Sequence, residues 1–178
     1  WDAPRLERFW NEYDAAGALP LWVDDRGGIT TQQTRARLAS FVREHDTAIL
    51  IFDYINLAGN RGDNRNVEIG SVARGLKDIA KEFHIPVVAL CQLNRDLEKR
   101  DTKNKEPQLS DLRDSGELEQ VAQVVMFLHR DDYNNRNMPD YQPDHKCKVN
   151  VAKNQDGAVG FTYLHFEEEF TRFEDMPC

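Results

Sequence analysis

The chain has 178 residues, of which 40% are hydrophobic, so it can bury one ordinary core, and we expect a single domain over residues 1–178. Charged residues make up 30% and the formal net charge is −8, which excludes a surface that is basic throughout and leaves room only for a local basic patch. No apolar run approaches membrane-spanning length, and the three cysteines form no Cys-x-x-Cys pair, so we expect no membrane partner and reduced thiols in the cytoplasm.

The N-terminal part of the sequence predicts two helices with a short strand between them. Pro4 suits a first helical turn, and an apolar stripe at three- and four-residue spacing then predicts a helix that ends near Gly17. For the aromatic members of the stripe, packing in a core is favoured over stacking on bases. These members are Phe9, Trp10 and Tyr13. Residues 21–23 predict a strand, and Thr30 is a suitable N-cap for a helix through His45.

The middle of the chain predicts two apolar strands separated by a helix. Residues 48–53 form an unbroken apolar run that ends in Asp53, which is typical of a strand buried on both faces. Residues 66–83 carry apolar side chains at helical spacing. Residues 86–92 form a second apolar strand, which ends in Gln92.

The C-terminal half predicts a strand followed by a hairpin. Ser110 or Asp111 could cap a short helix, residues 117–123 are expected to be helical, and residues 124–128 form another buried strand. We expect residues 131–144 to be a poorly ordered insertion. The hairpin pairs residues 148–152 with 160–166, and residues 170–173 form a last strand. Strands that alternate with helices and end in a hairpin indicate an α/β sheet with an antiparallel edge.

Two polar side chains follow the two apolar strands. Asp53 and Gln92 are expected side by side at the C-terminal edge of one sheet, where α/β proteins place ligand chemistry. In nucleotide hydrolases such a carboxylate holds magnesium and such an amide senses the γ-phosphate. The alternative is open, because many α/β proteins have an aspartate after a strand and a glutamine there is usually a loop residue. Two other candidate metal sites, Asp24 with Asp25 and the set His129, His145 and Cys147, are more simply solvated or structural residues.

Five sequence motifs in fixed order then identify a family. They span residues 53–57, 72–82, 86–95, 110–116 and 152–157. Together they closely resemble the C-terminal RecA-like ATPase domain of DnaB-type replicative DNA helicases, in register from about residue 20 to 173. The resemblance implies a P-loop NTPase core with a partly parallel sheet flanked by helices and a C-terminal antiparallel hairpin.

The resemblance implies roles for individual residues. Asp53 resembles the Walker B carboxylate, which binds Mg²⁺ through water, and Gln92 resembles the residue that couples nucleotide state to the DNA-facing loop. Residues 113–116 match the loop that holds the single-stranded backbone, through Arg113, Asp114 and Gly116. A solvated Arg113, or one paired with Asp111, is the alternative. Lys153 falls where the family presents a cation to the nucleotide of the neighbouring subunit, and Gln155 stands where the family has an arginine finger.

The phosphate loop of this family is missing, since none of the ten glycines is followed by lysine. The first residue, Trp1, also indicates a fragment or a processed chain. We therefore expect the chain to lack ATPase and helicase activity and to hold no cofactor tightly. The missing half includes a central strand between the strands ending near Gln92 and Leu128, so we expect the sheet to close up or another copy to supply pairing, as a dimer or by strand exchange.

For the full-length parent, the resemblance implies Mg²⁺ and ATP as cofactors, a hexameric ring, and single-stranded DNA as a partner, with primase and a loader as candidate partners. The parent would be an ATP-dependent DNA helicase. The alternative is a non-catalytic, truncated module that binds DNA or a helicase ring. The presence of both Asp53 and Gln92, which serve no purpose without nucleotide, favours a piece of an active enzyme.

Overall fold

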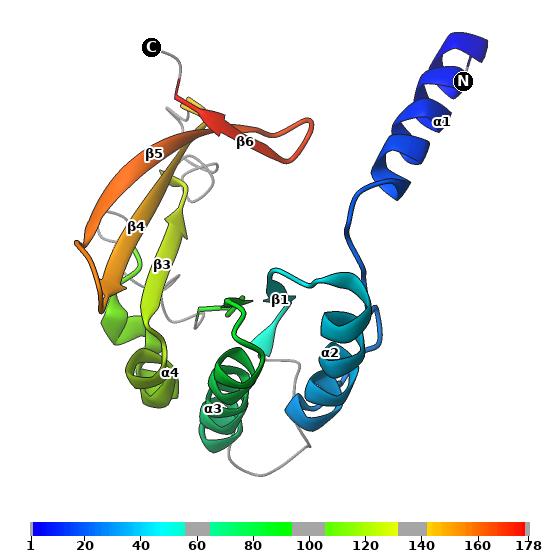
Figure 1. The fold of residues 1–178 in the computed structure, drawn as a ribbon. Helices are drawn as coiled ribbons and strands as arrows, with labels where there is room; N and C mark the ends of the chain where they lie inside the picture. Colours follow the sequence, from blue (N-terminus) through cyan, green and yellow to red (C-terminus); the bar gives the residue numbers. More distant parts are fainter. Residues whose placement is uncertain (1, 56–64, 94–105, 132–141, 177–178) are drawn as a thin grey trace.

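The computed structural model describes residues 2–55, 65–93, 106–131 and 142–176, without the side chains of residues 65–67 and 113–116. Its elements in chain order are α1 (Ala3–Gly17), α2 (Thr31–His45), β1 (Leu50–Phe52), α3 (Arg65–Phe83), β2 (Val87–Ala89), the 3₁₀ helix η3 (Leu109–Ser115), α4 (Gly116–Val121), β3 (Val124–His129), β4 (Lys146–Asn154), β5 (Gly160–Glu167) and β6 (Arg172–Asp175). Figure 1 shows β1 and β2 beside α2 and α3, a separate curved sheet of β3 to β6, and α1 standing apart. None of the helices in the described ranges is long and apolar enough to cross a membrane.

The first two helices begin at caps that their sequences supply. Asp2 accepts a hydrogen bond from the backbone N–H of Arg5 at the start of α1. At α2, the Thr30 hydroxyl accepts from the N–H of Gln33, whose side chain accepts from the N–H of Thr30, so both halves of a capping box are present. Both predicted helices are confirmed.

The strands form two sheets. β1 and β2 are parallel, with Phe52 opposite Ala89, whereas β3, β4, β5 and β6 form an antiparallel sheet in that order. The predicted hairpin is the pair β4 and β5, and the last strand is β6, two residues beyond its expected start. Within the described residues β2 does not pair with β3. The expectation that the sheet closes up is therefore wrong, because the two flanking strands stay in separate sheets.

The core lies around α3. Its buried positions include Val72, Leu76 and Ile79, which recur at helical spacing and belong to one cluster with Leu38 of α2 and Phe52 of β1. Gly75 lets α2 approach α3 closely, because a Cβ at that position would lie 2.9 to 3.0 Å from atoms of Thr31. This packing holds β1 and β2 against the two helices.

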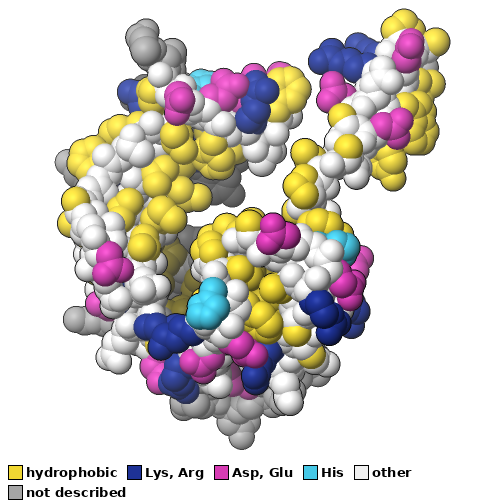
Figure 2. All heavy atoms as spheres, viewed as in Figure 1, with side chains coloured by type: hydrophobic (Ala, Val, Ile, Leu, Met, Phe, Trp, Pro, Cys, Tyr) yellow, Lys and Arg dark blue, Asp and Glu magenta, His cyan; other side chains and the backbone are white. Residues whose placement is uncertain are grey.

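Several predictions of burial are wrong. No residue of α1 is buried, and the aromatic side chains of its stripe are 45% (Phe9), 55% (Trp10) and 62% (Tyr13) exposed. Their rings contact one another instead, with centroids 5.3 Å apart for Phe9 and Trp10. Figure 2 shows the resulting apolar face of α1 in yellow. Helical periodicity thus predicted the stripe correctly but not what covers it.

The predicted strand at residues 21–23 is also absent: these residues are exposed, and they pair with no strand in the described part of the chain. The apolar strands are only partly buried. Ile51 of β1 is 59% exposed, and Met126 and Leu128 of β3 are 58% and 60% exposed, although Phe127 between them is buried. Most of the insertion at residues 131–144 lies outside the described residues, so the expectation about its order stays a prediction.

Candidate nucleotide and DNA site

Asp53 and Gln92 lie at the same edge of the parallel sheet. Asp53 directly follows β1, and Gln92 comes shortly after β2. The pairing continues past both strands, because the N–H of Leu90 donates to Phe52 O (3.0 Å) and the N–H of Ile55 donates to Leu90 O (2.9 Å). Both side chains are exposed. The Asp53–Tyr54 peptide bond is cis. An exposed carboxylate and an exposed amide therefore share one sheet edge, where the carboxyl ends of parallel strands present ligand-binding groups.

The protein groups at this edge can supply only part of the ligand shell of a magnesium ion. Mg²⁺ in nucleotide sites takes one or two protein carboxylates and completes its shell with water and phosphate oxygens, so Asp53 alone suffices on the protein side. Among the described residues there is no cluster of three or more His, Cys, Asp or Glu that would hold a metal without such help. The site is thus suited to a metal that arrives with a nucleotide.

The backbone of residues 113–116 spans the junction between η3 and α4. The side chains of Arg113 and Asp114 lie outside the described part of the structure, so their DNA-binding role stays a prediction. On either side of the junction, Leu112 and Leu118 are buried, with 7% and 8% of their surface exposed. Two apolar anchors therefore fix both ends of the predicted DNA-binding segment.

Lys153 lies in the four-stranded sheet and is engaged with helix α4. Its ammonium group donates to the carbonyl oxygens of Glu119 (2.5 Å) and Ala122 (2.7 Å). Lys77 of α3 donates to Val121 O (2.9 Å) beside them. In the sequence Lys77 is marked only by its place next to Leu76 on the apolar face of the helix, because a lysine on a helix is ordinarily a solvated charge.

Gln155 lies in the turn that follows β4. Its side chain is exposed and its N–H donates to Gln123 O (3.0 Å), which ties the turn to the residue before β3. Gly157 shapes the same turn, since a Cβ there would lie 2.7 Å from Nδ2 of Asn154. Lys153 and Gln155 are thus carried by a different sheet from Asp53 and Gln92.

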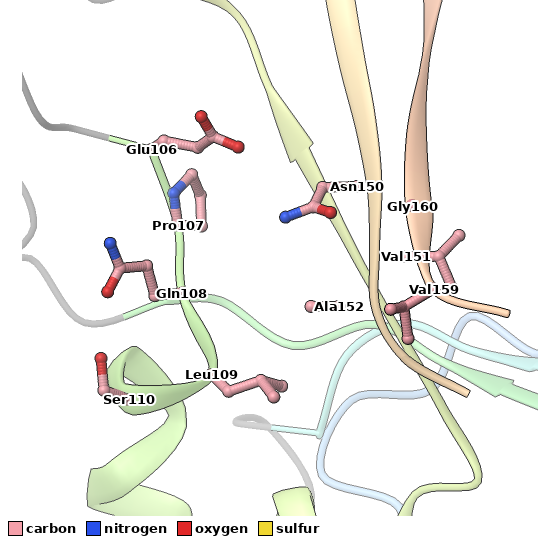
Figure 3. Close-up of a pocket in the computed structure, with 10 residues that line it drawn as sticks. All are labelled: Glu106, Pro107, Gln108, Leu109, Ser110, Asn150, Val151, Ala152, Val159 and Gly160. Carbon is pink, nitrogen blue, oxygen red and sulfur yellow. The ribbon is translucent and has the colours of Figure 1, made fainter. Parts of the chain in front are cut away.

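An open pocket of about 680 Å³ lies beside the strands of the larger sheet. Figure 3 shows it between the chain at residues 106–110 and the strands β4 and β5. The Glu106 carboxylate pairs with the Lys148 ammonium (2.6 Å) and raises the pKa of that lysine above its ordinary value of 10.5. This ion pair attaches the segment that leads into η3 to strand β4.

The weaker metal candidates have structural partners. Asp24 accepts two hydrogen bonds of 2.8 Å from Arg26, which lowers the pKa of this carboxyl from 3.8 to about 2. Buried His129 lies 2.8 Å from Asp131, and Cys147 is 1% exposed. Because the described residues contain no cluster of three such ligands, His129, His145 and Cys147 do not form a metal site there. Burial also raises the pKa of the Cys91 thiol, which favours the protonated, unreactive form.

Known proteins resemble this chain over most of its length. The family model of the DnaB-like helicase C-terminal domain matches residues 3–175. The replicative DNA helicase DnaB of Pasteurella multocida is 38% identical over 159 residues, which cover 88% of this chain and 33% of that protein. The chain therefore spans about a third of the length of such relatives.

Two solved structures have a similar fold. One is an ATPase domain, which superimposes with a TM-score of 0.74 at 34% identity, covering 83% of this chain and 52% of that chain. A DnaB-like replicative helicase, described together with its interactions with primase, gives a TM-score of 0.77 at 34% identity over 86% of this chain and 37% of that one. The expected ATPase-type α/β fold is thereby confirmed.

Proposed function

Because the chain belongs to the DnaB-like helicase C-terminal domain family, we propose that it is the distal part of the ATPase domain of a replicative DNA helicase. The full-length protein would couple ATP hydrolysis to translocation along single-stranded DNA and to unwinding of the duplex. The observation that carries the proposal is the common edge of Asp53 and Gln92, which follow two adjacent parallel strands.

Asp53 would hold Mg²⁺ through water, and Gln92 would respond to the γ-phosphate from the neighbouring strand end. Bound Mg²⁺ offsets negative charge on the β- and γ-phosphates. The sequence contains no Gly-Lys-Ser/Thr loop to cradle those phosphates, so this chain alone is expected to bind no nucleotide tightly and to turn over no ATP.

The single-strand contact would be made by residues 113–116. Arg113 supplies a cation for a phosphate, and Gly116 lets backbone amides approach the strand. One arginine in a short segment also suits a chain with a net charge of −8, since it concentrates positive charge where DNA passes.

In a hexameric ring Gln155 would face the nucleotide of a neighbouring subunit, and Lys153 would do so when its ammonium leaves the carbonyl oxygens of Glu119 and Ala122. Their place on the sheet that does not carry Asp53 is consistent with action on another copy's nucleotide. Primase is a further proposed partner, supported by the similar helicase that is described with its primase interactions; a loader is another.

In the alternative function, the chain would be a truncated module that binds DNA or a helicase ring without catalysis. The reading frame upstream of Trp1 distinguishes the two: a Gly-Lys-Ser/Thr loop there supports the helicase, and its absence supports the module.

The enzymatic proposal is tested with Asp53→Asn in the full-length protein. DNA-stimulated ATP hydrolysis should fall at least about a hundredfold, because metal assistance is worth several kcal/mol of transition-state stabilisation. Asp46→Asn is the matched control, since Asp46 is exposed and has the left-handed backbone that asparagine tolerates. Equal rates for wild type and Asp53→Asn would refute the assignment.

A further inference from the structure

The C-terminal end of α4 is held by two lysine side chains from different elements. Lys153 of β4 donates to the carbonyl oxygens of Glu119 and Ala122, and Lys77 of α3 donates to Val121 O. Lys153 also lies 3.5 Å from Gln120 O. Every carbonyl from 119 to 122 therefore has a lysine ammonium within hydrogen-bond distance.

This arrangement stabilises a helix that is too short to be stable by itself. The last carbonyls of a helix have no partners within the helix, and its C-terminal end carries partial negative charge. The two ammonium groups donate hydrogen bonds to these carbonyls and offset the negative charge. Such charge-assisted hydrogen bonds are stronger than neutral ones. The contacts to Val121 and Ala122 are partly buried, which reduces their screening by solvent.

The strand geometry beside Lys153 contributes to the cap. Val125 pairs with Lys153, but Met126 pairs with Val151, so Ala152 has no partner across the ladder. Such a bulge bends the strand and redirects a neighbouring side chain. Lys77 on α3 needs no bulge, because the buried Leu76 before it fixes the rotation of α3 about its axis and so the direction of Lys77.

Helix α4 begins at Gly116, the last residue of the segment proposed to bind DNA. A six-residue helix moves as one body, so contacts that hold its C-terminal end also set the position of its first residue. The contact made there by α3 is the hydrogen bond from Lys77 to Val121 O.

We infer that Lys77 is a positioning residue for single-stranded DNA: with Lys153 it caps α4 and thereby holds residues 113–116 in place. The inference rests on the proposed function, since it assigns Lys77 to the same DNA-binding segment. Lys77 contacts no DNA in this scheme and acts through α4. Lys153 shares the cap, so it links the strand proposed to face a neighbour's nucleotide to the helix that carries the DNA segment.

The test uses the full-length protein with a non-hydrolysable ATP analogue and a fluorescent oligo-dT strand. Lys77→Met keeps the aliphatic stem but removes the charge, and should weaken oligo-dT binding by roughly three- to tenfold. Lys77→Arg should restore most of the affinity. Hydrogen exchange should show faster exchange of the Ala122 amide, which donates to Leu118 O in wild type (3.0 Å), in Lys77→Met only.

Lys81→Met is the matched control, because Lys81 lies one helical turn further along α3 and is exposed; its affinity and exchange should equal those of wild type. If Lys77→Met binds oligo-dT as tightly as wild type while Arg113→Ala has lost binding, this inference is overturned and the proposed DNA-binding segment is not. Unchanged affinity in Arg113→Ala would instead count against the proposed DNA-binding segment, and the inference would fail with it. Equal loss in Lys77→Met and Lys77→Arg would also overturn it, since the charge would then not matter.

Discussion

At the scale of single residues, the contacts of Lys153 and Gln155 are made with residues far away in the sequence, so the residues next to them in the chain do not predict these contacts. Lys153 contacts carbonyls about thirty residues earlier in the chain, and Gln155 is bonded through its backbone to Gln123. Gln155 nevertheless keeps an exposed side chain at the position where an arginine finger is expected. A neutral amide cannot offset the negative charge that develops during phosphoryl transfer as a guanidinium can.

We therefore predict that Gln155→Arg raises DNA-stimulated ATP hydrolysis by the full-length enzyme. The gain should be roughly tenfold or more, because in GTPases an arginine finger is worth about a thousandfold or more. Steady-state rates with saturating single-stranded DNA would measure it. Gln155→Lys adds the same charge without the planar fork and should gain less, and Gln32→Arg, at an exposed position of α2, should gain nothing. No rise in Gln155→Arg would contradict the prediction.

At the scale of elements, local signals determined where helices begin. The capping box at Thr30 involves only residues 30–33, so the sequence contains all of it. Strands depended on partners. Residues 21–23 have the composition of a strand but pair with no strand among the residues that the structure describes, whereas β4 and β5 pair across a short turn. This difference follows from hydrogen bonding, which is internal to a helix and external to a strand.

The capping box at the start of α2 gives a prediction at the scale of elements. Thr30→Ala should lower the free energy of unfolding by about 1 kcal/mol, because it leaves the Gln33 amide without its hydroxyl partner. Urea unfolding followed by circular dichroism measures the change. Gln32→Ala, at a neighbouring exposed position, should leave stability within about 0.5 kcal/mol of wild type. A Thr30→Ala variant as stable as Gln32→Ala would show that the box contributes nothing.

At the scale of the whole molecule, the chain buries less surface than its size allows. Its accessible surface is 13545 Å², whereas a compact monomer of 20.6 kDa would expose about 8,900 Å². Figure 2 shows hydrophobic side chains gathered in the hollow between the larger sheet and the body of α2 and α3. The exposed apolar residues on β1, β2 and β3 lie on the two sheets that fail to join. Apolar surface of this extent favours association.

We accordingly expect the isolated chain to self-associate. Light scattering should give a mass above 20.6 kDa that rises with concentration, and Met126→Glu should shift the distribution toward the monomer, because it places a charge on the exposed apolar face of β3. Thr162→Glu, which adds the same charge at an exposed polar position of β5, should leave the mass unchanged. A wild-type chain that is strictly monomeric would contradict the expectation.

The sequence by itself determined the family, the Thr30 cap, the order of the elements from α2 onward and the edge shared by Asp53 and Gln92. These depend on local hydrogen bonds, on periodicity and on the order of motifs, and the sequence contains all three. Only the tertiary structure decided that the stripe of α1 is uncovered, that β2 and β3 lie in separate sheets, and that Lys77 and Lys153 cap α4. Each of these depends on which distant segments meet, and periodicity specifies an apolar face without specifying what packs against it.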